Sequence, residues 1–192
     1  MYLPLTIFIL LAIQIWQDKG GLTWDISILT AIHQTAHPTL DRIASILTNF
    51  GTRWGVFPFS IAFSLILLSL RRWRSLTYFL IAMVGCGQIN LLAKQVLHRA
   101  RPDLWEYPLH PNFSFPSGHA MSSMGLIAAL AILTWGTRWC RWVVWLGSIF
   151  VIAIGWTRLY LGVHYPSDIL AGWMLAIAWA VGVSLVVKPQ CS

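Results

Sequence analysis

The chain has 192 residues, of which 57% are hydrophobic and only 10% are charged, and its formal net charge is +7. Its mean hydropathy of +0.68 is well outside the usual range of soluble domains and indicates a protein embedded in a bilayer. The 13 basic residues are scattered between apolar segments, which argues against nucleic-acid binding and favours membrane topology and an anionic substrate. The three cysteines have no CxxC spacing and are odd in number, which argues against a disulfide framework.

Six segments without Asp, Glu, Lys or Arg have the length of a membrane-spanning helix: 1–17, 54–70, 75–93, 120–137, 142–157 and 169–187. We therefore predict an all-α polytopic membrane protein with six transmembrane helices, forming a single membrane-embedded domain over residues 1–192. The first segment resembles a signal peptide in length. It has no preceding basic residue and no small-residue cleavage site, so we expect a retained helix.

Residues 22–50, between the first two spans, are too polar to cross a membrane. Apolar residues recur there at helical spacing in two pieces separated by Pro38. We predict two amphipathic helices lying at the interface. They either guide lipid into a site or simply pack against the bundle.

The basic residues predict an orientation. With a cytoplasmic N-terminus, six crossings place one set of basic residues on the cytoplasmic side, in line with the positive-inside rule. This set is Arg71, Arg72, Arg74, Arg138, Arg141 and Lys188. All six acidic residues fall on the other side. Three groups of ionisable residues that suggest a chemical role also fall there, and they are described next. We therefore expect an extracytoplasmic active site.

The first such group is KQVLHRARP, residues 94–102, after the third span. If the helix continues to Pro102, then Lys94, His98 and Arg101 lie on one face. Adjacent cations repel each other, so their placement indicates an anion between them.

The second group is FPSGH, residues 115–119, before the fourth span. Ser117 is a good N-cap residue, so we expect a helix to begin there. The free backbone N–H groups and the positive end of the helix dipole would form an anion site, and Gly118 would let a phosphate approach closely.

The third group is TRLYLGVHYPSD, residues 157–168, between the last two spans. Pro166 suits the first turn of a helix, which places His164 just before that helix and Asp168 inside its first turn. The carboxylate would then orient the imidazole and stabilise its charged form. Together the three groups supply the cations, histidines and carboxylate that phosphoryl transfer requires.

These residues resemble the three motifs of the type 2 phosphatidic acid phosphatase superfamily, which also includes vanadium haloperoxidases. The motifs are usually written KxxxxxxRP, PSGH and SRxxxxxHxxxD, and the departure here is Thr157 in place of serine. The resemblance implies that His164 is a nucleophile forming a phosphohistidine, Asp168 its orienting partner and His119 the general acid. It also implies a set of phosphate-binding residues, namely Lys94, Arg101, Ser117, Gly118 and Arg158. No metal or other cofactor is implied.

The function predicted from this resemblance is metal-independent hydrolysis of a lipid phosphate monoester or diphosphate in the cell membrane. Phosphatidylglycerophosphate, phosphatidate and a polyprenyl diphosphate stay open as substrates, and the oligomeric state is undetermined. The alternatives are a lipid-to-lipid phosphotransferase, a non-catalytic lipid-binding membrane protein and a haloperoxidase. His98 and Arg99 fall outside the motifs.

Overall fold

The computed structural model describes residues 1–18, 20–104 and 112–190, and all regular structure in these ranges is helical, as the sequence predicted. The helices are α1 (Tyr2–Gln17), α2 (Thr23–His33), α3 (Pro38–Leu47), the 3-10 helix η1 (Thr48–Gly51), α4 (Val56–Ser69), α5 (Trp73–Leu97), α6 (Gly118–Leu133), α7 (Arg138–Tyr160) and α8 (Pro166–Val187).

Four stretches of the described chain are helical, long and apolar enough to cross a membrane: Pro38–Ser69, Trp73–Leu97, Arg138–Tyr160 and Pro166–Val187. They overlap the second, third, fifth and sixth predicted spans, and the first stretch joins α3, η1 and α4. α1 and α6 are also apolar but have 16 residues each, or about 24 Å of helix. That is shorter than a hydrocarbon core of about 30 Å, so the crossing of α1 and α6 stays a prediction.

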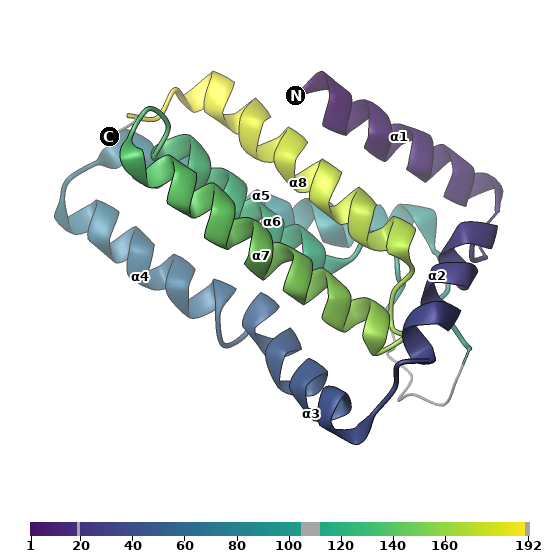
Figure 1. The fold of residues 1–192 in the computed structure, drawn as a ribbon. Coiled ribbons are helices and arrows are strands. Elements are labelled where there is room, and N and C mark those ends of the chain that lie inside the picture. The colour runs from purple at the N-terminus through teal and green to yellow at the C-terminus, as the bar shows by residue number, and fades with distance from the viewer. Residues whose placement is uncertain (19, 105–111, 191–192) are drawn as a thin grey trace.

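The long helices pack side by side, with α6 and α8 at the centre (Figure 1). α6 contacts α5, α7 and α8, whereas α1 lies along α8. A Cβ atom on Gly172 of α8 would lie 2.9 Å from the Ser117 carbonyl oxygen. Glycine is therefore needed where the start of α6 approaches the second turn of α8.

The outer faces of the bundle are apolar. Large hydrophobic side chains are exposed on α4, α5 and α7, among them Phe57, Leu65, Val84, Trp145 and Ile152. In water such a surface would be strongly unfavourable, whereas in hydrocarbon it costs little. The exposed apolar surface and the long apolar helices make this a membrane protein.

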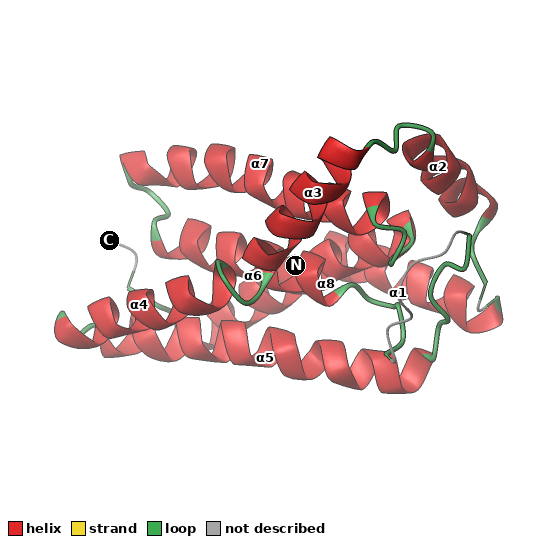
Figure 2. Cartoon of the chain, turned by 90° about the horizontal axis from the view of Figure 1, so that it is seen from below, coloured by secondary structure: helices red, strands yellow, loops and turns green. Residues whose placement is uncertain are grey.

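α2 and α3 lie at one end of the bundle, where α5 and α7 end and α6 and α8 begin (Figures 1 and 2). Figure 2 shows α3 crossing α7, and Ala44 of α3 packs there against Tyr160 and Val163. The Tyr160 hydroxyl donates a hydrogen bond to Asp41 Oδ1 at 2.6 Å. α3 begins at Pro38, the point where the sequence divides residues 22–50 into two helices.

α5 ends earlier than the sequence predicted. Its last residue is Leu97, and His98 follows in the left-handed conformation with φ 48°. The Ser114 N–H then donates to the Arg99 carbonyl at 2.9 Å, which draws the chain out of the helix. The prediction of a single helical face carrying Lys94, His98 and Arg101 is therefore wrong. His98 is exposed, and its ring lies edge-on to Phe113 with centroids 4.6 Å apart.

Candidate active site

The three sequence motifs meet at the end of the bundle covered by α2 and α3. Because the long helices alternate in direction, the ends of α5 and α7 lie beside the beginnings of α6 and α8. Lys94 comes from the last turn of α5 and Arg158 from the last turn of α7. His164 lies in the connection to α8, and Asp168 in the first turn of that helix.

The beginning of α6 follows the sequence prediction. Ser117 is the N-cap, and its hydroxyl oxygen accepts from the Ala120 N–H at 3.5 Å. The Ser117 N–H donates to the Asp168 carbonyl at 3.1 Å, while the Asn90 side-chain amide donates to the Pro116 carbonyl at 3.0 Å. The first turns of α6 and α8 are thus joined directly, and the N-terminus of α6 offers N–H groups and a positive dipole end to an anion.

His164 is held in one orientation. Its Nδ1 lies 3.3 Å from Asp168 Oδ2, and its Nε2 lies 3.3 Å from Nη1 of Arg101. A guanidinium group only donates, so Nε2 is the acceptor and the ring proton resides on Nδ1, facing the carboxylate. The lone pair of Nε2 therefore faces a cation.

The surroundings also keep His164 neutral. Its exposure is 2%, and burial lowers the pKa of His164 well below its usual value. Nearby positive charges lower this pKa further; they belong to Arg158, Arg101, Lys94 and His119. An unprotonated imidazole with its lone pair on Nε2 is a nucleophile at neutral pH.

Three basic side chains, those of Lys94, Arg101 and Arg158, lie near the His164 imidazole. Arg101 donates to the carbonyls of Val163 at 2.7 Å and Asn112 at 2.8 Å, and Lys94 donates to the carbonyls of Phe113 and Ser114. In the described part of the chain neither Lys94 nor Arg101 forms an ion pair. Backbone carbonyls thus orient these two side chains without neutralising them, which leaves their charge available to an anion.

The segment between α3 and α4 completes the site. Thr48 Oγ1 accepts from Arg158 Nη1 at 2.8 Å, and Thr52 Oγ1 lies 3.3 Å from His119 Nε2. The Ser122 hydroxyl donates to the Gly51 carbonyl at 2.7 Å, tying this segment to α6. The sequence motifs give no sign of Thr48 or Thr52, since both lie more than 40 residues before the first motif.

A cavity of about 400 Å³ opens beside His119 and Gly118, and Thr52, Gly87 and Ser122 also line it. The last three residues line a second cavity of about 720 Å³ as well, between α4 and α5, whose other walls are mainly apolar. The two cavities together form a groove, which we call the α4–α5 groove. It leads from His119 to the outer surface of the bundle.

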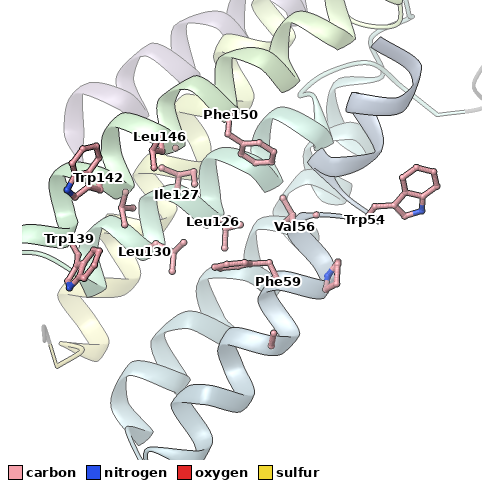
Figure 3. Close-up of a pocket in the computed structure, with 15 residues that line it drawn as sticks. Trp54, Val56, Phe59, Leu126, Ile127, Leu130, Trp139, Trp142, Leu146 and Phe150 are labelled. Carbon is pink, nitrogen blue, oxygen red and sulfur yellow. The ribbon is translucent and has the colours of Figure 1, made fainter. Parts of the chain in front are cut away.

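A further apolar pocket of about 800 Å³ lies between α4, α6 and α7 (Figure 3). Trp54 lies at one end of it, and Trp139 and Trp142 at the other. No residue of the three motifs lines this pocket, so it is separate from the candidate active site.

Two buried charged residues behind Asp168 were missed by sequence reasoning. Arg99 has no exposed side-chain surface and forms ion pairs with Asp25 of α2 and with Asp168. The one available signal was the cost of placing charges beside membrane-spanning helices. This cost suggested that a charged residue such as Arg99 has a partner, but the sequence did not show that the partners are Asp25 and Asp168.

Comparisons with known proteins relate the chain to one superfamily and to several named phosphatases. The model of the PAP2 superfamily matches residues 75–190. The undecaprenyl-diphosphatase of Sulfolobus acidocaldarius is 26% identical over 196 residues, covering 97% of this chain and 90% of its own. Phosphatidylglycerophosphatase B of Bacillus subtilis is 26% identical over 187 residues, covering 92% and 91%.

Among solved structures, a transmembrane PAP2-type phosphatidylglycerolphosphate phosphatase from Bacillus subtilis superposes with a TM-score of 0.82. It is 23% identical in sequence, and the match covers 98% of this chain and 97% of that one. This similarity extends the shared fold beyond the motifs to α1, α2 and α3.

Proposed function

This chain belongs to the PAP2 superfamily, and from that premise we propose that it is a membrane enzyme that hydrolyses a lipid phosphate monoester or diphosphate. Two relatives that match nearly its whole length are named for such reactions, one on undecaprenyl diphosphate and one on phosphatidylglycerophosphate. The proposed mechanism uses a phosphohistidine on His164 and no metal.

The observation that carries the proposal is the state of His164. A neutral imidazole presents its Nε2 lone pair toward Arg101, while Asp168 lies at Nδ1. A cation at that position attracts the anionic phosphate to the nucleophile. The carboxylate stabilises the imidazolium charge that develops as the Nε2–P bond forms.

In the first step, His164 Nε2 attacks phosphorus in line with the leaving oxygen. The N–P bond forms, the P–O bond to the lipid breaks, and His119 donates its proton to the departing oxygen. The charge on the phosphoryl oxygens is shared among a set of side chains and the start of α6: Lys94, Arg101, Ser117, Gly118 and Arg158. In the second step, water attacks phosphorus, His119 takes the water's proton, and inorganic phosphate leaves with His164 restored.

The α4–α5 groove suits the lipid part of the substrate. Its walls are mainly apolar and it reaches His119, the residue assigned to the leaving group. A lipid whose tail lies in this groove would place its leaving oxygen beside His119 and its phosphate over the start of α6.

We place the site at the extracytoplasmic surface of the cell membrane. The α4–α5 turn and the start of α7, which carry basic residues, lie at the opposite end of the bundle from the connection between α7 and α8 that contains His164 (Figure 1). With that basic end cytoplasmic, α1 and α6 add two crossings to the four long stretches. Within the stretch Pro38–Ser69, α4 then makes the crossing, while α2 and α3 lie along the membrane surface above the site.

The test is phosphate release by the purified protein in detergent with EDTA present. The panel contains phosphatidate, phosphatidylglycerophosphate and undecaprenyl diphosphate. We expect release from at least one lipid by the wild type, and none above background by His164→Ala. The matched control is His98→Asn, which removes an exposed histidine at the same end of the bundle and should leave the rate unchanged.

A second measurement identifies the intermediate. With a ³²P-labelled lipid and rapid quenching, the wild type should yield an acid-labile, base-stable phosphoprotein that His164→Ala does not form. EDTA-sensitive release, or equal release by His164→Ala, would overturn the proposed mechanism. Transfer of the label to an added lipid alcohol in preference to water would instead identify a phosphotransferase.

A further inference from the structure

Behind His164 lies a second layer of charge that belongs to none of the three motifs. Arg99 is completely buried, and its guanidinium lies 4.2 Å from the centroid of the Tyr165 ring. Its Nη1 donates to Ser167 Oγ at 2.7 Å and to Asp168 Oδ1 at 2.5 Å. Its Nη2 donates to Asp25 Oδ2 at 2.7 Å, and both Nε and Nη2 donate to the Gly20 carbonyl. Every nitrogen of this side chain is engaged.

The contact with Arg99 determines how Asp168 faces His164. Oδ1 of Asp168 accepts from Arg99, whereas Oδ2 accepts from the Tyr165 N–H at 2.9 Å and lies 3.3 Å from His164 Nδ1. A carboxylate is planar, so holding both oxygens fixes its rotation. Without the guanidinium, Oδ1 would lose its charged partner, and the Tyr165 N–H would be the remaining hydrogen-bond donor that holds the carboxylate beside the imidazole.

Asp25 holds Arg99 in turn and joins α2 to α8. Its Oδ1 accepts from the Ser167 N–H at 2.8 Å, and its Oδ2 accepts from the Ser167 hydroxyl at 2.6 Å as well as from Arg99. This carboxylate also has no exposed surface. Two buried carboxylates held by the same side chain repel each other unless a cation lies between them, and Arg99 is that cation.

We propose that Arg99 and Asp25 are positioning residues for the nucleophile, which act through Asp168 to hold His164 with its proton on Nδ1 and its lone pair on Nε2. The proposal rests on the proposed function for its kinetic consequence. The orientation of His164 is a property of the protein without substrate. Because Arg99 contacts neither His164 nor the proposed phosphate-binding side chains, its loss should affect turnover more than substrate binding.

The kinetic test compares Arg99→Gln, Arg99→Lys and Asp25→Asn in the full-length protein. Groups that orient a metal-binding histidine typically contribute roughly 10–100-fold. By analogy, we expect Arg99→Gln to lower kcat by about that factor, while KM changes less than about threefold. Arg99→Lys keeps the charge but loses the fork of donors, and should fall between wild type and Arg99→Gln. Asp25→Asn should show the smallest loss.

The matched control is Asp41→Asn. Asp41 also bonds across two helices at this end of the bundle, to the Tyr160 hydroxyl at 2.6 Å, but it has no contact with Asp168 or Arg99 in the described structure. It should therefore keep the wild-type kcat. If Asp25→Asn and Asp41→Asn lowered kcat equally, the loss would be a general effect of removing a carboxylate, and Asp25 would have no positioning role.

The second readout does not depend on turnover. In protein labelled with ¹⁵N-histidine, the wild type should show His164 as a single neutral tautomer protonated on Nδ1, assigned by its absence from His164→Ala. Arg99→Gln should show averaged nitrogen shifts. If no lipid is hydrolysed yet the tautomer is lost in Arg99→Gln, the proposed function fails and the positioning role stands.

The opposite result would overturn the inference: a folded Arg99→Gln protein with wild-type kcat and a single His164 tautomer. If Arg99→Gln does not elute as a folded protein, Ser167→Ala takes its place, because it removes the hydroxyl between Arg99 and Asp25 and leaves all charges. We then expect a several-fold loss of kcat with a mixed tautomer, and unchanged values for both would contradict the role of this layer.

Discussion

The two histidines of the site lie in contrasting surroundings. His164 is almost completely buried, and a chain of charged groups extends behind it through Asp168 and Arg99 to Asp25. His119 is partly exposed, lies beside the α4–α5 groove, and has the Thr52 hydroxyl 3.3 Å from its Nε2. One half of the site is buried and held by ion pairs, and the other half is open toward the α4–α5 groove.

The difference matches the two proposed tasks. A nucleophile has to present one lone pair to phosphorus in every turnover, so a fixed tautomer is an advantage. A general acid meets the part of the substrate that differs between lipids, and has to exchange protons with water after each turnover. If this comparison is right, variants in the buried half should affect all substrates alike, whereas variants in the open half should depend on the lipid.

The largest effect is expected in the buried half. Asp168→Asn keeps the shape of the side chain but removes its charge and presents an amide to His164 Nδ1. By comparison with the equivalent change in a catalytic triad, we expect kcat to fall by about 10⁴-fold. The measurement is phosphate release from a monoester and a diphosphate lipid, and the loss should be the same for both. A loss that differs strongly between the two lipids would contradict the assignment of Asp168 to the nucleophile.

His119→Asn should produce a substrate-dependent loss. General acid catalysis typically contributes about 10²–10⁴-fold, and a phosphate leaving group needs less protonation than an alkoxide. We therefore expect the larger loss of kcat with the monoester. With the diphosphate, the second step should become limiting and the phosphohistidine should accumulate in rapid-quench experiments. Equal losses without accumulation would remove His119 from the leaving-group role.

The groove is tested by Gly87→Leu. A Cβ atom on Gly87 would meet no atom within 4 Å, so the backbone leaves room for a side chain, and we expect the leucine to fill part of the groove. We expect KM for a long-chain lipid to rise about tenfold, while a short-chain soluble analogue is little affected. Gly182→Leu, a helical glycine at the far end of α8 with its nearest contact at 3.7 Å, is the control. Equal KM values in the two variants would argue against tail binding in the groove.

Thr52→Val should have a smaller effect, because it removes one hydroxyl next to His119. A hydrogen bond of this kind contributes about 0.5–1.5 kcal/mol, which corresponds to a loss of kcat of about two- to tenfold. Thr52→Ser keeps the hydroxyl and should restore the rate. A wild-type rate in Thr52→Val would show that the hydroxyl does not support His119, and a loss in Thr52→Ser alone would assign the support to the methyl group.

The smallest effect is on stability at acidic pH. Burial and neighbouring cations lower the pKa of His164 in the folded protein, whereas a histidine in an unfolded chain titrates near pH 6.5. As pH falls below about 6.5, the unfolded state therefore binds a proton that the folded state does not. The free energy of unfolding then decreases by at most about 1.4 kcal/mol per pH unit, until the folded pKa is reached.

His164→Gln removes this proton uptake. Its Tm in detergent should therefore fall less between pH 7 and pH 5 than that of the wild type, while Thr52→Val, which keeps His164, should follow the wild type. An identical pH dependence of Tm in His164→Gln and the wild type would mean that the folded environment does not favour neutral His164.

Local patterns were enough to predict much of this molecule. Apolar length marked the helices, Ser117 and Pro166 marked the starts of α6 and α8, and the motif spacing identified the residues that meet at one end of the bundle. Caps and helix lengths depend on a few neighbouring residues, so they can be read from the chain directly. The end of α5 was mispredicted because it is set by residues outside the segment, through the contacts of Arg99 and Ser114.

The tertiary structure alone decided which side chains surround and support His164. Arg99 is 74 residues from Asp25 and 69 from Asp168, and Thr48 and Thr52 reach the site from a segment with no motif. Such partners are selected by the cost of leaving a charge or donor unpaired inside the protein. That cost exists only once packing has excluded water. The sequence therefore pointed to the groups that we propose carry out the chemistry, and packing determined which ring nitrogen of His164 faces the cations.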